Sequence, residues 1–280
     1  MSSYAGKAHA EKRGPGNPGS GNSYEGRKAV VTGGTHGIGM AVVKALLAGG
    51  AEVLLTGLNE KNIEAARTEL GAGAHVLRSD AASLADIDAL GKTVEDTLGE
   101  VDFVFVNVGH VRFGSLGQVT EEAYDAMFDT NTKGAFFTAQ RLAPLVKDGG
   151  SFVFTTAAVA GTAFVGTSAG TAMKAAIRAF SRVFASELLP RNIRVNTVSP
   201  GFTQTPTMGL VGISDEQRAL NQREGERVTP MRRFGTPEEV AAAVLFLGFE
   251  ATFTNGVDLP VDGGLAQGLE YPHDEVVTEH

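Results

Sequence analysis

The sequence predicts a single-domain α/β fold in which a mostly parallel, doubly wound sheet of seven strands carries helices on both faces. Three observations favour this fold class. Strand-like and helix-like segments alternate along nearly the whole chain of 280 residues. Two strand-like runs are continuously apolar, as strands buried on both faces of a parallel sheet are. A glycine-rich loop separates the first strand-like run from the first helical one.

The first half of the chain repeats a strand followed by a helix. Its β-rich runs predict strands at residues 28–32, 53–56, 75–78 and 103–106. Its segments with helical apolar spacing predict helices at residues 40–47, 61–70 and 83–98. Because each helix links two strands, we expect these strands to be parallel.

The second half continues the same order with longer helices. Predicted strands lie at residues 151–154, 193–198 and 257–260. Predicted helices lie at residues 131–146, 169–188 and 237–248. Residues 201–229 show neither period and are predicted to be irregular. Since crossovers between parallel strands are right-handed, this order indicates helices on both faces of the sheet.

Composition limits the classes of partner and site. The chain has no cysteine, which excludes disulfides and thiolate chemistry and is compatible with a reducing cytoplasm, the expected location. A net charge of −8 without a basic patch argues against nucleic acid. No apolar run is long enough to predict a membrane span. No metal site is predicted. We expect a flexible arm at residues 1–24, the folded domain at residues 25–269 and a tail at residues 270–280.

The loop Thr32-Gly-Gly-Thr-His-Gly-Ile-Gly39 is the first element that carries chemistry. Its glycines allow a sharp turn after the strand and let a pyrophosphate approach the amides at a helix N-terminus, where the helix dipole favours an anion. An ordinary strand-to-helix turn is the alternative interpretation. The position of the loop and its TGxxxGIG spacing favour nucleotide binding.

With this loop and several later motifs, residues 25–269 resemble the short-chain dehydrogenase/reductase family, whose fold is of the Rossmann type. The later motifs are, in chain order, Asp80, Val106-Asn-Val-Gly109, Asn131, Lys174, Ser199-Pro-Gly-Phe-Thr-Gln-Thr205 and Val261-Asp-Gly-Gly264. The resemblance implies a nicotinamide dinucleotide cofactor. The residues it assigns to that cofactor are Gly33, Thr35, His36, Gly37, Ile38, Gly39, Leu58, Asp80, Ala81, Asn107, Gly109, Lys174, Pro200, Gly201, Thr203 and Thr205.

Two departures from the family pattern bear on catalysis. The family tyrosine, a general acid or base four residues before the lysine, is replaced by Gly170. Ala158 stands where the carbonyl-polarising serine is expected, with Ala157 as the other possible register. Lys174 and Asn131 match the remaining catalytic residues. His110 is the predicted replacement acid because histidine titrates near neutrality. An exposed loop histidine without a catalytic role is the alternative for His110.

The residues after the second strand bear on the choice between the two dinucleotides. An acidic side chain there would bind the ribose 2′-hydroxyl and repel a 2′-phosphate. Gly57 and Leu58 supply no acid, and His36 occupies the loop position where NADP-binding relatives carry a basic residue. The sequence therefore favours NADP(H) over NAD(H).

The segment after residue 201 is expected to form a wall of the substrate pocket. The predicted pocket residues are Ala158, Phe164, Gly170, Phe202 and Met208. They indicate a small-molecule substrate that is mainly apolar. The resemblance also implies a homotetramer or homodimer, formed through the long helices and the last strand.

Three functions remain open from the sequence. The first is an NAD(P)(H)-dependent oxidoreductase with a non-standard active site that reduces an imine, an iminium ion or a conjugated system. The second is a non-redox cyclase, dehydratase or isomerase on the same scaffold. The third is a catalytically silent ligand-binding homologue. We expect the first, because hydride transfer depends on positioning the nicotinamide and the residues assigned to that task are present.

Overall fold

The computed structural model describes residues 23–206, 214–269 and 271, and it contains a seven-stranded parallel sheet in the order β3-β2-β1-β4-β5-β6-β7. The strands are β1 (Lys28–Val31), β2 (Glu52–Gly57), β3 (Ala74–Arg78), β4 (Val101–Val106), β5 (Val146–Thr155), β6 (Arg194–Pro200) and β7 (Asp258–Val261). This architecture confirms the predicted fold class. Met208 and nearly all of the predicted arm and tail lie outside the described residues.

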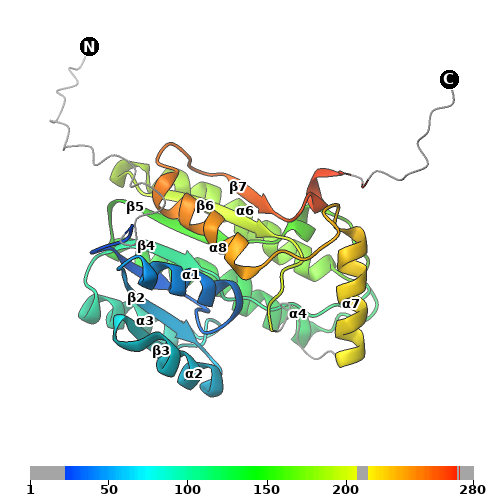
Figure 1. The fold of residues 1–280 in the computed structure, drawn as a ribbon, viewed down its shortest axis with the longest axis horizontal. Coiled ribbons are helices and arrows are strands. Elements are labelled where there is room, and N and C mark those ends of the chain that lie inside the picture. Colours follow the sequence, from blue (N-terminus) through cyan, green and yellow to red (C-terminus); the bar gives the residue numbers. More distant parts are fainter. Residues whose placement is uncertain (1–22, 207–213, 270, 272–280) are drawn as a thin grey trace, which may run out of the picture.

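Helices cover both faces of the sheet. They are α1 (Gly37–Ala48), α2 (Glu60–Leu70), α3 (Leu84–Thr97), α4 (Glu121–Phe128), α5 (Gly134–Leu142), α6 (Ser168–Glu187), α7 (Asp215–Val228) and α8 (Pro237–Leu245). Figure 1 shows α1 and α8 side by side across the sheet, and the two helices contact each other. Helices α3, α5 and α6 contact one another in the second layer.

Strands β1, β2, β4, β5 and β6 contribute side chains to two separate cores. Val31 and Phe105 pack with α1 and α8 on one face. Their neighbours Val30 and Val104 pack with α3, α5 and α6 on the other face. Because successive side chains of a strand point to opposite faces, burial on both sides requires every position to be apolar. This requirement explains the continuous apolar runs in the sequence.

Two expectations about the helices were wrong. The region predicted to be irregular contains α7, whose polar composition hides its helical period. A capping box between Ser214 and Gln217 starts this helix and was the available sequence signal. The helix predicted to begin at Asn131 begins ten residues earlier, at Glu121. Asn131 lies inside a wide π-helical turn (Asp129–Lys133) that joins α4 to α5.

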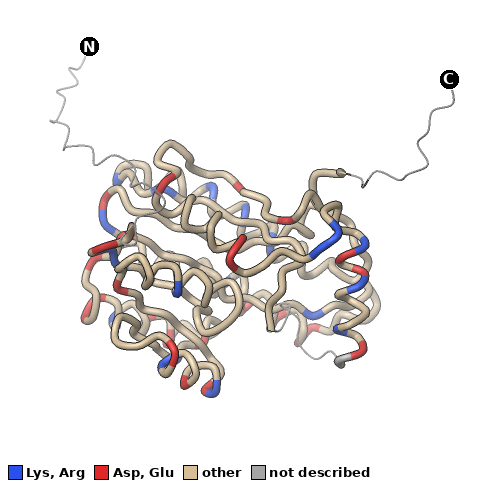
Figure 2. Tube along the Cα trace, in the orientation of Figure 1, with Lys and Arg blue, Asp and Glu red and all other residues tan. Residues whose placement is uncertain are grey.

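Charges of both signs are interspersed on the surface. Figure 2 shows Lys and Arg alternating with Asp and Glu along α7. Among the described residues, no helix has both the length and the apolarity that crossing a bilayer requires.

Asp102 ties the amino-terminal end of β4 to two neighbouring elements. Its carboxylate accepts hydrogen bonds from the Arg27 side chain at 2.8 Å, the Lys28 amide at 2.9 Å and the Lys147 ammonium at 2.9 Å. Burial alone would raise the pKa of Asp102, but the Lys28 amide and the Lys147 and Arg27 cations outweigh it and lower that pKa below 3.8.

We expect Asp102→Asn to lower the free energy of unfolding at neutral pH by about 1–3 kcal/mol, because hydrogen bonds to a charged acceptor are lost. A carboxyl with a lowered pKa stabilises the fold above its unfolded-state pKa and loses this contribution as pH falls through its folded-state pKa. The difference between wild type and variant should therefore shrink in acid. Urea unfolding followed by circular dichroism measures both effects. Asp96→Asn, at an exposed ion pair with Lys92, is the control. An equal loss in both variants would contradict the assignment.

Candidate active site

The candidate site lies at the carboxyl ends of β1 and β4, where the strand order reverses. Ligands of doubly wound sheets bind in the crevice at such a switch point. The loop after β1 and the loop after β4 meet there. A side-chain carbon at Gly33 would lie 3.3 Å from both Asn107 Nδ2 and Val108, so the two backbones approach closely. The structure thus brings together two segments that the sequence assigned to the cofactor.

The glycine-rich loop has the backbone that an anion site requires. Gly33 and Gly37 adopt φ angles of +64° and +55°, which disfavour side chains. A side-chain carbon at Gly39 would lie 2.2 Å from the Gly33 carbonyl oxygen. The first turn of α1 has no acidic residue and no capping side chain, whereas α2, α3, α4, α7 and α8 each have a side-chain cap. The amides of α1 therefore remain available to a pyrophosphate.

The other predicted residues of this loop lie beside these glycines. Thr35 is buried, and its methyl group would be 2.5 Å from a side-chain carbon at Gly57. Ile38 packs against the α1 core. His36 precedes α1, its buried Nδ1 has no hydrogen-bond partner among the described residues, and burial lowers its pKa. His36 is therefore neutral at neutral pH.

A chain of hydrogen bonds connects β4, β5 and α6. Asn107 Nδ2 donates to the Gly33 carbonyl at 3.3 Å, and Asn107 Oδ1 accepts from Thr155 Oγ1 at 2.9 Å. The backbone carbonyl of Thr155 accepts from Lys174 Nζ at 3.0 Å. This chain holds Lys174 at the switch point. The residues assigned from the sequence omitted Thr155 because its place opposite Asn107 follows from the pairing of Phe154 with Val106.

Gly109 leaves room between Lys174 and Asn131. A side-chain carbon at Gly109 would lie 3.2 Å from Lys174 Nζ and 2.5 Å from Asn131 Oδ1. Asn131 is fully buried, and its Nδ2 donates to the carbonyls of Met127 at 2.8 Å and His110 at 2.9 Å. Its Oδ1 has no partner among the described residues. The three residues predicted to be catalytic, Lys174, Asn131 and His110, are therefore neighbours.

The site carries positive charge, and no carboxylate among the described residues is a cause of the pKa shifts of Lys174 and His110. Burial lowers the pKa of Lys174 from 10.5 to about 8. Burial also lowers the pKa of His110, and the charges of Arg112 and Lys174 lower it further. His110 is consequently neutral at neutral pH, which makes it a sparsely populated proton donor. Lys174 keeps its proton below pH 8.

Gly170 lies on α6, one turn before Lys174. It is buried, and a side-chain carbon there would lie 2.8 Å from Val111 Cγ2, so Val111 occupies part of this space. Ala158 is also buried, in a short 3₁₀ turn (Ala158–Gly161) after β5. The Thr171 hydroxyl donates to Thr167, away from Lys174. Phe164 is half-buried, and its carbonyl accepts from Thr167 Oγ1 at 2.8 Å.

Three residues that the sequence assigned to the cofactor follow β2 and β3: Leu58, Asp80 and Ala81. Leu58 is 52% exposed, directly after β2. Asp80 Oδ1 accepts from the Ala82 amide at 2.9 Å, which fixes the turn after β3. The Ala81 carbonyl approaches α5 so closely that a side-chain carbon at Gly134 would lie 2.4 Å from it. These residues border the same edge of the sheet as the glycine-rich loop.

The segment after β6 returns to the glycine-rich loop. Pro200 is the last residue of β6 and pairs with Val261 of β7. Thr203 Oγ1 donates to the Gly201 carbonyl at 3.1 Å. The Thr205 methyl group would lie 3.2 Å from a side-chain carbon at Gly37. The structure therefore brings the segment after β6, which the sequence assigned to the cofactor, against the glycine-rich loop.

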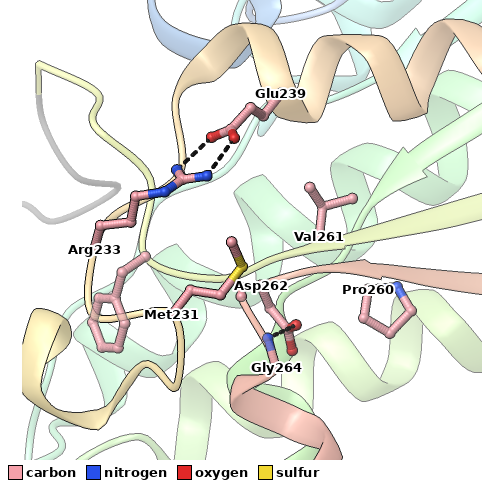
Figure 3. A pocket seen from close by; sticks show the side chains of 10 residues that line it. Met231, Arg233, Glu239, Pro260, Val261, Asp262 and Gly264 are labelled. Atoms are coloured by element: carbon pink, nitrogen blue, oxygen red, sulfur yellow. Dashed lines mark hydrogen bonds and ion pairs between the residues drawn. The ribbon is translucent and has the colours of Figure 1, made fainter. Parts of the chain in front are cut away.

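A pocket of about 330 Å³ lies beside this segment, around the end of β7 (Figure 3). Its apolar lining includes Phe202, Met231 and Val261. Arg233 and Glu239 form a paired contact at its rim, with bonds of 2.9 and 2.6 Å. Of the predicted substrate residues that the structure describes, Phe202 alone lines this pocket, and its ring also packs against Phe234 at 5.4 Å. The polar groups of this pocket are largely satisfied by one another.

Comparison with known proteins agrees with this geometry. A family model described as enoyl-(acyl carrier protein) reductase matches residues 33–266. Oxidoreductase asL5 of Sarocladium schorii is 34% identical over 245 residues, which cover 86% of this chain and 96% of that protein.

Two solved structures share the fold over nearly their whole length. A 3-ketoacyl-(acyl-carrier-protein) reductase from Brucella melitensis, complexed with NADH, has a TM-score of 0.80 and 26% identity over 87% of this chain and all (100%) of its own. A blue fluorescent protein from a metagenomic library, in complex with NADPH, has a TM-score of 0.78 and 29% identity over 86% of this chain and 98% of its own. With its parallel sheet, its glycine-rich loop and these relatives, the chain belongs to the short-chain dehydrogenase/reductase family of NAD(P)-dependent oxidoreductases.

Proposed function

We propose that this protein is an NAD(P)(H)-dependent oxidoreductase with a non-standard active site, and that it reduces a mainly apolar substrate whose carbonyl is conjugated to a carbon–carbon double bond. The observation that carries the proposal is Lys174, a half-buried cation with no acidic hydroxyl on the helix turn before it. Gly170 stands at the family's tyrosine position and Ala158 at its serine position. Reduction of an isolated carbonyl would lack the usual proton donor.

Charge distinguishes among the substrates left open by the sequence. An iminium ion would bring a positive charge next to Lys174, which repels it in a poorly solvated site. Hydride addition at the β-carbon of a conjugated carbonyl instead moves the π electrons onto the oxygen as an enolate, which then takes a proton at its α-carbon from solvent water. Lys174 stabilises that charge as it develops, which is the form of catalysis that lowers a barrier most. The positive site therefore supports a conjugated carbonyl.

Each group at the site has a separate role in the proposed reaction. A bound reduced nicotinamide supplies the hydride. Lys174 Nζ has three N–H donors, and its hydrogen bond to Thr155 leaves two for a ribose hydroxyl and the substrate oxygen. The uncapped N-terminus of α1 receives the pyrophosphate. Asn131 joins the His110 loop to the π-helical turn and keeps Gly109 beside Lys174.

We propose a preference for NADP(H) over NAD(H) at this site. Gly57 and the exposed Leu58 place no carboxylate after β2 to repel a 2′-phosphate. Arg78, which pairs in register with Gly57, brings a cation to the same edge, where it contacts Glu60 at 3.2 Å. His36 contributes a hydrogen-bonding group without charge because burial lowers its pKa.

We also propose that the chain forms a homodimer or homotetramer. A face of small residues on α6 offers close approach to a second copy; its residues are Ala172, Ala175, Ala176 and Ala179. Val183 of the same helix is 54% exposed. A second apolar hollow lies between α5 and α6, lined by Phe128, Phe136, Phe137 and Phe180. Both surfaces lie on the long helices through which the family associates.

Substrate class is tested by following NADPH and NADH absorbance with matched apolar substrates: an α,β-unsaturated ketone, its saturated analogue and a cyclic imine. We expect consumption of the cofactor with the unsaturated ketone at a rate at least about 100-fold above the other two, because only this substrate can do without the missing acid. Binding of NADPH is measured separately by calorimetry. Binding without turnover of any substrate would favour a non-redox or silent homologue.

Restoring the missing hydroxyls should restore ordinary carbonyl reduction. We expect Gly170→Tyr with Ala158→Ser to gain activity on the saturated ketone by about 100-fold or more, provided that Val111→Ala makes room for the new ring. The double variant without Val111→Ala is the matched control, because Val111 Cγ2 would lie 2.8 Å from the new side chain's first carbon. Full cofactor binding with no gain would refute the assignment of Gly170.

The pH dependence of kcat/KM should follow the protonation of Lys174. Because the protonated amine is the active form, we expect kcat/KM for the unsaturated ketone to be level in weak acid and to fall as pH rises through about 8. Lys174→Arg keeps a cation at every accessible pH and should give a lower but level profile. Lys174→Met should cost roughly 10²–10³ in rate. A wild-type profile that stays level above the pKa of Lys174 would contradict this role.

A further inference from the structure

The loop after β4 contains Arg112, whose side chain has no partner among the described residues. The guanidinium of Arg112 is exposed and forms no hydrogen bond or ion pair with any residue that the structure describes. Its backbone is nevertheless fixed, because the Arg112 amide donates to Met127 Sδ at 3.3 Å. The preceding residue, Val111, packs against Gly170. Arg112 therefore stands at the mouth of the site on an anchored backbone.

The surroundings of Arg112 leave its charge uncompensated. Arg112 and Lys174 both act electrostatically on His110, and no carboxylate is among the groups that do so. Most arginines that the structure describes contact a carboxylate or a carbonyl, as Arg27, Arg191 and Arg233 do. An anion brought by a ligand is the missing partner.

We propose that Arg112 binds a carboxylate on the substrate, at the end remote from the conjugated carbonyl that Lys174 contacts. This inference rests on the proposed function, which it extends by giving the substrate an acidic end. The planar guanidinium matches a carboxylate with two parallel hydrogen bonds. Val111, which separates Arg112 from the site, packs against the space at Gly170 and supplies an apolar wall between the two charged ends.

The number of charges favours a monoanion. His110 is neutral at neutral pH, since burial, Arg112 and Lys174 all lower its pKa. The mouth therefore offers the single charge of Arg112, which one carboxylate balances. A phosphate monoester carries more charge than this mouth supplies. Carboxylate and phosphate share the same guanidinium chemistry, so the test includes both.

The test is calorimetric titration of the protein saturated with NADP⁺, using three ligands with the same apolar body: 3-phenylpropanoate, 3-phenylpropanamide and 2-phenylethyl phosphate. We expect the carboxylate to bind about tenfold more tightly than the amide, as a charge-assisted pair does over a neutral one. Arg112→Gln should remove this preference and leave amide binding unchanged. Arg182→Gln is the matched control, since Arg182 is also exposed and without a partner in the described part of the chain, but lies on α6 two turns beyond Lys174.

Each other outcome overturns the inference. Equal binding of carboxylate and amide by the wild type, or equal loss of the preference in both arginine variants, would remove the subsite. Tighter binding of the phosphate would replace the carboxylate as its ligand. Repeating the titration without nucleotide keeps the two proposals separate. Failure to bind NADP⁺ or to consume NADPH counts against the proposed function, whereas the carboxylate preference of the nucleotide-free protein still decides the role of Arg112.

Discussion

Burial of the parallel sheet on both faces is the constraint on which the rest of this structure depends. It forces apolar side chains at successive positions such as Val30 and Val31, one for each core. It also requires the helices to be distributed over the two faces, so that the chain leaves β1 towards one side and β4 towards the other. The two loops separate at that point, and the site forms between them. Asn107 spans the separation with its bond to the Gly33 carbonyl.

At this point of the sheet, the site combines the positive charge of Lys174 with room for a ligand beside it. The ammonium of Lys174 donates to the Thr155 carbonyl and forms no ion pair with a described residue, and burial lowers its pKa to about 8. Gly109 leaves room beside Lys174, and Val111 occupies part of the space at Gly170. A positive group in a poorly solvated cavity favours reactions that create negative charge. The same imbalance extends to Arg112 at the mouth, so one electrostatic principle connects the proposed chemistry with the proposed substrate end.

The local patterns of the chain predicted the elements with strong signals well. The strands of the double core were found because burial on both faces leaves a continuous apolar run. The glycine-rich loop was found because its turn and its close approach each require a glycine. Helix α7 was missed because its stability does not come from an apolar stripe; its sequence is polar, and only the Ser214 capping box marks its start. Helix α4 was missed because the prediction began the helix at Asn131, inside a π-helical turn.

The sequence by itself determined the fold class, the order of the strands and most of the helices, because these depend on local composition and on short spacings. It also predicted the cofactor loop and singled out Lys174 and Asn131. Tertiary structure alone decided what those residues contact. The bond from Lys174 to Thr155 follows from strand register, and Val111 fills the space at Gly170 because a loop from β4 crosses α6 there. It also decided that His110 is neutral, since its pKa depends on burial and on two cations brought near it by folding. Contacts between distant elements depend on packing geometry, which no short window of sequence encodes.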